Sequence, residues 1–307
     1  MSDQADGLRQ WVQARSGVSV VAEMPPIVRE PKAGPRARSL VLTSGKGGVG
    51  TSNLALNLAI ALGERGSRVV LVDADLGLAN IDLLCGLAPD CDLGDVLAGD
   101  RPLLDAIVAG PGAIRIIPGA HGSRTLVETL GDAPRRLVDE LSRLEGEADY
   151  LVVDAGSGLG PSIATLAAAA DEVLIVTTPE PTSVADAHAA IHRFRRLAAP
   201  PTLRAVVNQV SSTLEADEVL TRLTASSRQF FGAVVDGLGS VRSDPHVPLA
   251  VRARQPFSTA YPTAAASRDV RRLARLLRER DREVPRARRP GFFAALAARW
   301  ALGKVAL

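Results

Sequence analysis

A glycine-rich loop that directly follows a short apolar run constrains the fold of this chain more than any other feature. The apolar run is 40–42, and the loop at 44–53 reads Ser-Gly-Lys-Gly-Gly-Val-Gly-Thr-Ser-Asn. Glycines let a backbone wrap closely around an anion, and the free N–H groups that open the following helix point at its phosphates. A helical pattern with Leu54, Leu58 and Leu62 on one face comes next. Strand, loop and helix together predict a phosphate-binding loop rather than a simple tight turn.

One position of this loop departs from the usual pattern. The motif G-x-x-x-x-G-K-[ST] has a lysine directly before the hydroxyl that binds Mg²⁺, whereas this chain has Thr51 before Ser52. A charge-assisted phosphate contact contributes about 1.5–3 kcal/mol, so its loss predicts weaker nucleotide binding and slow hydrolysis. Lys46 supplies a cation earlier in the loop. We expect the nucleotide to be bound by Gly45, Lys46, Gly47, Gly48, Val49, Gly50, Thr51 and Ser52.

Apolar runs of strand length alternate with helical patterns between Ser39 and about Arg282. The expected strands are 40–43, 68–72, 114–117, 150–153, 172–177, 203–207 and 233–236. This alternation predicts an α/β fold with a doubly wound, mostly parallel sheet. The 307 residues, 46% of them hydrophobic, suffice for one large core. We therefore expect three parts, namely an N-terminal helix with a flexible linker (1–38), a P-loop domain (39–282), and a basic linker with an amphipathic helix (283–307).

Polar side chains follow three other predicted strands. Asp73 and Asp75 come after the second strand, Asp154 closes the fourth, and Asn208 follows the sixth. Ligands of an open parallel sheet collect beyond the carboxyl ends of its strands, so these side chains should lie beside the phosphate loop. Each carboxylate alone could be a helix cap or a turn residue. Together they predict that Asp154 holds Mg²⁺ through water and that the N–H of Gly158 faces a γ-phosphate.

Positive charge is concentrated near the C-terminus of a chain whose formal net charge is only +2. Residues 268–289 hold ten arginines and four acidic residues, a pattern typical of a solvated helix face, an anionic-membrane patch or a nucleic-acid arm. Few aromatic residues accompany the arginines, so a nucleic-acid partner is not expected. In the last helical segment one sector gathers large apolar residues, with basic residues beside it. It predicts an interfacial helix on an anionic membrane, with a helix packed on the core as the alternative. The membrane-facing residues would be Phe292, Phe293, Leu296 and Trp300.

The cysteines and the N-terminus bear on location. Cys85 and Cys91 have a C-x₅-C spacing that fits neither a zinc knuckle nor a redox pair, so we expect free thiols. The first residues carry no signal-peptide pattern, and no apolar stretch reaches transmembrane length. We expect a cytoplasmic protein that associates reversibly with the inner face of the cell membrane.

Five motifs together resemble those of the MinD/ParA deviant-Walker ATPases, over about Ser39 to Arg282. They are Lys-Gly-Gly-Val-Gly at 46–50, Asp-Ala-Asp-Leu-Gly-Leu-Ala-Asn at 73–80, Asp-Ala-Gly-Ser-Gly at 154–158, Thr-Pro-Glu-Pro-Thr-Ser at 178–183, and Val-Asn at 207–208. The resemblance implies an ATPase that uses ATP and Mg²⁺ and forms a homodimer when ATP is bound.

The same resemblance implies roles for individual residues. Lys46 would reach the partner's nucleotide across the dimer, and Asp75 would orient the attacking water. Ser52, Asp73 and Asp154 would form the Mg²⁺ shell. Asn208 would contact adenine.

The first residues are similar to a motif of one group in this family, the flagellar-number regulators called FlhG. The chain reads Asp-Gln-Ala-Asp-Gly-Leu-Arg at 3–9, and the motif is Asp-Gln-Ala-x-x-Leu-Arg. This similarity implies a switch for flagellar number and placement that stimulates FlhF, a GTPase of the signal-recognition-particle type, through Gln4. A pseudo-ATPase scaffold of the same fold and a division or partitioning ATPase remain alternatives. An iron–sulfur carrier is disfavoured because it needs a C-x-x-C pair.

Overall fold

The computed structural model describes most of the chain. It covers residues 36–75, 79–119, 135–283 and 290–301. For six residues it describes the backbone alone, namely Arg135, Arg136, Arg282, Glu283, Trp300 and Ala301. The predicted motif with Gln4 and the predicted membrane contact of Trp300 therefore lie outside the described residues and side chains.

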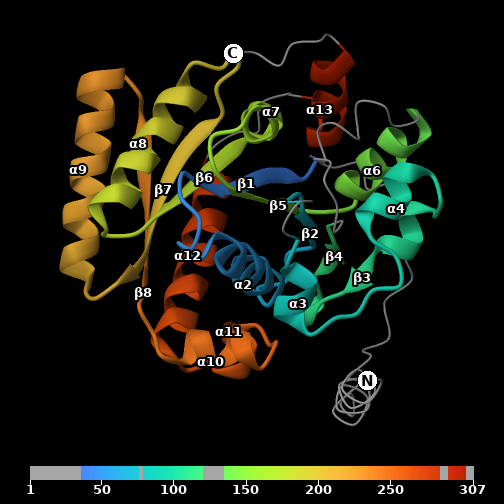
Figure 1. Ribbon diagram of the computed structural model, residues 1–307, viewed down its shortest axis with the longest axis horizontal. Coiled ribbons are helices and arrows are strands. Elements are labelled where there is room, and N and C mark those ends of the chain that lie inside the picture. Colours follow the sequence, from blue (N-terminus) through green and yellow to red (C-terminus); the bar gives the residue numbers. More distant parts are fainter. Residues whose placement is uncertain (1–35, 76–78, 120–134, 284–289, 302–307) are drawn as a thin grey trace, which may run out of the picture. The chain divides into compact units, whose positions relative to one another are not determined.

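One sheet forms the centre of the described part, with the strand order β3-β4-β2-β5-β1-β6-β7-β8 (Figure 1). All neighbours are parallel except β3 and β4. This arrangement confirms the predicted α/β fold with a mostly parallel sheet. The strands are β1 (Arg38–Ser44), β2 (Val69–Asp73), β3 (Val108–Ala109), β4 (Arg115–Ile117), β5 (Tyr150–Ser157), β6 (Glu172–Thr177), β7 (Thr202–Val210) and β8 (Val235–Arg242).

Helices connect the strands and cover both faces of the sheet. The α-helices are α2 (Thr51–Gly63), α3 (Ile81–Cys85), α4 (Leu93–Ala98), α6 (Arg135–Gly146), α7 (Pro161–Ala169), α8 (Pro181–Arg195), α9 (Thr213–Phe231), α10 (His246–Arg252), α11 (Phe257–Ala260), α12 (Ala265–Glu283) and α13 (Phe292–Ala301). Two short 3₁₀ helices, η1 (Leu103–Ala106) and η2 (Pro111–Ala113), flank β3.

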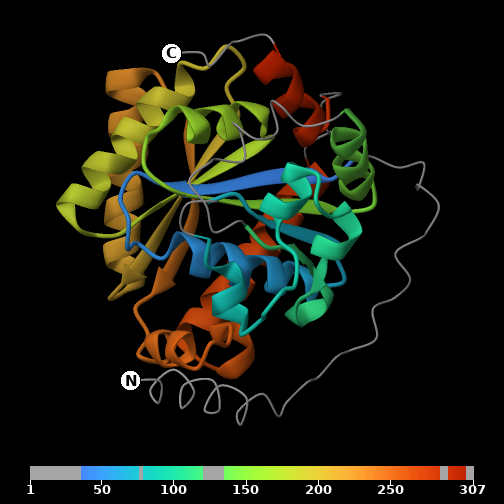
Figure 2. The same ribbon diagram turned by 45° about the vertical axis from the view of Figure 1, so that its right-hand side comes forward.

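The buried apolar side chains form two large clusters, one on each face of the sheet. Successive residues of a strand point to opposite faces. In β1, Leu40 and Leu42 accordingly join α2 and α12, whereas Val41 joins α7, α8 and α13. Figure 2 shows α2 in blue on one side of β1 and α7 in green on the other. Because both faces are covered, the central strands are apolar throughout, which is why the sequence reveals them.

The edge strand β3 is the one strand that the apolar runs do not predict. It has two residues and pairs antiparallel to β4, with Val108 half-buried and Ala109 exposed. So short a strand leaves no periodic pattern. The opposite edge, β8, begins and ends later than predicted. Its second half escaped prediction because Gly239 and Ser240 separate the buried Leu238 and Val241, so there is no continuous apolar run. Cys85 and Cys91 are free thiols, as predicted.

The helix α13 corrects one prediction. It packs against α6 and α7, and Phe292, Phe293 and Leu296 are each at most 1% exposed. The expectation that these three side chains lie open to lipid is therefore wrong for this conformation, and the core-packed alternative holds. An apolar stripe in a helical sequence indicates that one face of the helix is buried, but it does not distinguish burial in lipid from burial against protein. Among the described helices, none is long and apolar enough to cross a bilayer.

Candidate active site

The loop between β1 and α2 has the backbone of a phosphate-binding loop. Gly48 and Gly50 have left-handed φ angles of 83° and 88°, which glycine adopts without strain. Gly50 is the N-cap of α2, and no side chain caps that helix. The first N–H groups of an α-helix have no partner within the helix. The uncapped N-terminus of α2 is therefore arranged to bind an anion, as the sequence predicts.

Two predicted carboxylates meet beside this loop. Asp73 and Asp154 are direct neighbours in the register of β2 and β5, and they are 1% and 0% exposed. Asp73 accepts hydrogen bonds from the backbone N–H groups of Asn80 (3.0 Å), Ile81 (3.1 Å) and Asp75 (3.2 Å). The parallel strands bring the two carboxylates together, as predicted. Asp154 lies inside β5 rather than beyond its end, because β5 continues to Ser157.

Burial and mutual repulsion shift the titration of this pair. Burial, with the charge of Asp154 second, raises the pKa of Asp73 to about 8, although its three backbone hydrogen bonds oppose the shift. Burial also raises the pKa of Asp154 to about 6, against hydrogen bonds from Ser52 and the N–H of Gly156. The ionised pair is thus unfavourable in the protein alone, and a nearby cation would stabilise it.

The donor set fits a magnesium ion that a nucleotide brings with it. The Oδ2 atom of Asp154 is buried and has no hydrogen-bond partner, so it is available to a metal-bound water. Ser52, in the first turn of α2, lies close enough to lower the pKa of Asp154. Within the described residues, no group of three or more His, Cys, Asp or Glu could hold a metal. Mg²⁺ prefers few carboxylates together with water and phosphate oxygens, which agrees with this set.

Thr51, the departure from the usual motif, points into the loop. It is 7% exposed, and its hydroxyl donates to Ser44 Oγ at 2.9 Å. Ser44 in turn donates to the carbonyl of Lys46 at 2.8 Å. Thr51 therefore braces the loop through a chain of hydroxyl groups, and Ser44 is a site residue that the sequence pattern did not single out.

Lys46 extends away from the loop in the free chain. Its Nζ lies 2.6 Å from Glu180 Oε2 and 3.3 Å from Thr182 Oγ1, both just after β6. The two charged side chains are 42% and 64% exposed, so the ion pair stabilises the fold little and can open readily. Glu180 belongs to the motif at 178–183, but nothing in the sequence predicts its pairing with Lys46.

Asn208 and Gln209 hold the same loop from the end of β7. Asn208 Nδ2 donates to the carbonyl of Val49 at 2.7 Å, and Gln209 Nε2 lies 3.4 Å from the carbonyl of Gly48. Gln209 also has a left-handed φ of 60°, uncommon for a residue other than glycine. The amide predicted to read adenine thus braces the phosphate loop in this conformation. Gln209 gives no sequence signal for its role.

The predicted role of Gly158 needs correction. Its N–H donates to the carbonyl of Ser44 at 2.7 Å and is therefore not free for a γ-phosphate in this conformation. Asp75 lies over the backbone of Gly156, where an added Cβ atom would collide with its carboxylate. The end of β5 and Gly158 consequently pack against both the phosphate loop and Asp75, which follows β2.

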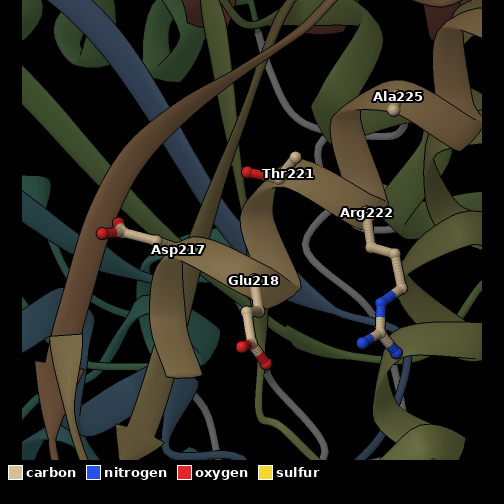
Figure 3. A pocket seen from close by; sticks show the side chains of 5 residues that line it. All are labelled: Asp217, Glu218, Thr221, Arg222 and Ala225. Carbon is tan, nitrogen blue, oxygen red and sulfur yellow. The ribbon is translucent and has the colours of Figure 1, made fainter. Parts of the chain in front are cut away.

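A surface hollow on α9 is separate from this site. It is lined by Asp217, Glu218, Thr221, Arg222 and Ala225. All five come from one helix, and Figure 3 shows Asp217 pointing to the opposite side from Arg222. The side chains do not converge on a point where a ligand could be held, so this hollow is not the candidate site.

The fold and the site define a P-loop nucleotide-binding protein with a mostly parallel α/β sheet. A family model for the AAA domain matches residues 37–205. The antiactivator FleN of Pseudomonas aeruginosa is 38% identical over 228 residues, which cover 74% of this chain and 81% of FleN. The flagellum site-determining protein YlxH of Helicobacter pylori is 32% identical over 240 residues, which cover 78% of this chain and 81% of YlxH.

Solved structures agree with these sequence matches. The septum site-determining protein MinD of Pyrococcus horikoshii, complexed with Mg-ADP, superposes with a TM-score of 0.64 and 26% identity, covering 80% of this chain and 97% of MinD. This chain therefore belongs to the MinD-like P-loop ATPases. Within that family it is similar to the flagellar regulators FleN and YlxH.

Proposed function

We propose that this protein is an ATP-dependent switch that regulates flagellar number or placement. The observation that carries the proposal is an anion-binding loop set beside two buried aspartates, in a chain 38% identical to the antiactivator FleN. Its parts are an N-terminal activator segment (1–38), the ATPase domain (39–282), and a basic linker with a membrane-targeting helix (283–307).

Each site residue has a part in binding and hydrolysis of ATP. The loop N–H groups from Gly45 to Ser52 bind the phosphates, with Asn208 in reach of the base. Ser52, Asp73 and Asp154 hold Mg²⁺, which supplies positive charge against the phosphates. Asp75 positions the attacking water for in-line transfer. Hydrolysis is slow because Thr51 supplies no cation where negative charge develops.

Lys46 links nucleotide binding to dimerisation. In the free chain it pairs with Glu180 on its own subunit. We propose that it leaves Glu180 when two ATP-bound subunits meet and then reaches the nucleotide of the partner. An exposed pair of this kind contributes about 0–1 kcal/mol, so giving it up is not an obstacle to the dimer.

The two ends of the chain serve partners in this proposal. Gln4 stimulates an FlhF-type GTPase. The helix α13 leaves α6 and α7 in the ATP-bound dimer and binds an anionic membrane through Phe292, Phe293, Leu296 and Trp300. The protein is then cytoplasmic and reversibly bound to the inner face of the cell membrane. The basic residues of 283–307 serve this membrane rather than nucleic acid.

A pseudo-ATPase scaffold is the second candidate, favoured by Thr51 alone. The test is calorimetry of Mg-ATP binding together with turnover of the full chain, with and without anionic vesicles. Binding with slow turnover supports the switch, and Asp75→Ala should then retain binding and lose turnover. No binding of Mg-ATP would favour the scaffold. Binding with equal turnover in Asp75→Ala would remove Asp75 from the mechanism.

A further inference from the structure

A single buried carboxylate holds the first turn of α13. Glu145, in the last turn of α6, is 2% exposed. Its Oε1 accepts the N–H of Phe292 at 2.9 Å, and its Oε2 accepts the N–H of Phe293 at 3.3 Å. The first N–H groups of a helix lack internal partners, and a negative charge there is favourable. Glu145 therefore acts as the N-terminal cap of α13 from another helix.

Gly291, the residue directly before α13, lies close to the carboxylate of Glu145. An added Cβ atom on Gly291 would lie only 2.9 Å from Glu145 Oε2. The backbone thus passes close to the carboxylate, and a larger residue at position 291 would displace it. Such a close approach makes the docking of α13 sensitive to any movement of Glu145.

Arg36 brings a positive charge to Glu145. Its guanidinium lies 3.7 Å from Glu145 Oε1 and donates to both oxygens of Asp171, at 3.0 and 2.6 Å. Ser39 fixes Asp171 through its N–H and its hydroxyl. Burial raises the pKa of Glu145, which the N–H groups of Phe292 and Phe293 and the charge of Arg36 oppose. Asp171 pushes that pKa up.

Arg36 also lies two residues before β1, where the preceding segment of the chain joins the sheet. We propose that the Arg36–Glu145 contact couples the chain entering β1 to the docking of α13, so that drawing Arg36 away releases the helix. Without Arg36, Glu145 would be a buried charge facing Asp171. A buried charge that has lost its partner strongly destabilises its surroundings. Glu145 would then take up a proton or turn to water, and either change removes the cap of α13.

This coupling deepens the proposed function, on which its biological meaning rests. A partner that binds the segment before β1 and moves Arg36 would thereby free the apolar face of α13. The signal at one end of the chain would expose the surface at the other end.

The test is hydrogen exchange of the full chain, read at the amides of α13 and, as internal reference, at those of β5. Arg36→Met keeps the length of the side chain and removes its charge. We expect exchange in α13 to rise on the order of tenfold while β5 is unchanged, because the positive charge beside Glu145 is lost locally. The control is Arg115→Met, which breaks the 2.8 Å ion pair with Glu147 beside the same end of α6. That variant should leave α13 unchanged.

A double variant shows whether Arg36 acts through Glu145. Glu145→Gln alone should also speed exchange in α13, and adding Arg36→Met to it should give no further rise. Unchanged exchange in Arg36→Met, an equal rise in β5, or fully additive effects would each overturn the coupling. These readouts need no ATP, vesicles or GTPase. If Arg36→Met frees α13 but the chain still does not bind anionic vesicles, the proposed membrane role fails and the coupling stands.

Discussion

Asp73 and Asp154 lie opposite each other in the parallel register of β2 and β5, and both side chains are buried. The usual P-loop motif has a lysine at the position of Thr51, whereas the hydroxyl of Thr51 donates to Ser44 and brings no positive charge. The free protein therefore carries acidic repulsion that only protons or a bound cation can relieve.

Asp154→Asn should stabilise the free protein and abolish Mg-ATP binding. The folded pKa of Asp73 is about 8 and that of Asp154 about 6, both above their ordinary value of 3.8. Groups raised in this way stabilise the fold below pH 3.8 and lose that contribution as pH rises towards 8. We expect the substitution to raise the free energy of unfolding by about 1–2 kcal/mol at pH 8, and less at pH 5. Urea unfolding without Mg²⁺ at both pH values measures this difference.

Asp171→Asn provides the contrast. Although burial opposes it, hydrogen bonds from Arg36 and Ser39 hold the pKa of Asp171 below its ordinary value, so this carboxylate is stabilising when charged. That variant should lower stability at pH 8. If both Asp154→Asn and Asp171→Asn raised the free energy of unfolding at pH 8, removing any carboxylate would have the same effect. The account of the Asp73–Asp154 pair would then fail.

Thr51→Lys should tighten Mg-ATP binding by about ten- to a hundredfold, since it adds one charge-assisted phosphate contact. Turnover should rise as well. Calorimetry and phosphate release measure the two effects. Thr51→Ala, which removes the hydrogen bond to Ser44 without adding charge, should bind ATP no better than the original chain. Equal affinity in the two variants would mean that position 51 does not reach the phosphates.

Phe292→Ala should cost less global stability than Phe194→Ala, although both side chains are fully buried. A Phe→Ala change in a core costs about 3–5 kcal/mol. Phe194 on α8 should show the full cost. In the Phe292 variant α13 can undock by itself, so the loss is limited to the free energy of its docking. Denaturant unfolding compares the two, and equal losses would show that α13 is an inseparable part of the domain.

Asp244→Asn should remove part of the acid sensitivity of the fold. One carboxylate oxygen of Asp244 accepts hydrogen bonds from the backbone N–H and the ring Nδ1 of His246. The other oxygen accepts a hydrogen bond from the N–H of Ala266 at the start of α12. Burial pushes the pKa of Asp244 upward, but these hydrogen bonds outweigh it and lower the pKa to about 2. Such a group stabilises the fold above pH 3.8, and this contribution disappears as pH falls towards 2.

Between pH 5 and pH 2 the original chain should therefore lose about 2 kcal/mol more than the Asp244→Asn variant. Thermal or urea unfolding over that range is the measurement. Parallel pH curves for the two proteins would show that the pKa of Asp244 is not depressed in the folded state.

Sequence reasoning predicted the sheet and the meeting of Asp73 with Asp154 because parallel strands impose both. Apolar strands buried on two faces are recognisable, and their carboxyl ends share one edge. The sequence alone could not predict that the N–H of Gly158 donates to the carbonyl of Ser44, or that Lys46 forms an ion pair with Glu180. Those contacts depend on loop conformations that no periodic pattern encodes. The two-residue β3 is invisible for the same reason.

The sequence also could not predict that α6 and α7 bury the apolar face of α13. Phe292, Phe293 and Leu296 form an apolar stripe that suits a membrane and the surfaces of α6 and α7 equally well. The deciding residue, Glu145, lies 147 positions before Phe292 in the chain, and nothing in its neighbourhood marks it as a helix cap.

The docked α13 makes the protein its own competitive inhibitor. Any surface that needs Phe292, Phe293 and Leu296 must compete with α6 and α7, which hold these side chains without any loss of translational freedom. The apparent dissociation constant for that surface is the intrinsic constant divided by the undocked fraction. If about 1% of the molecules have α13 undocked, binding is about a hundredfold weaker than the helix alone could achieve. Whatever shifts the docking equilibrium therefore sets the apparent affinity for such a surface, without changing any contact that the surface makes with the helix.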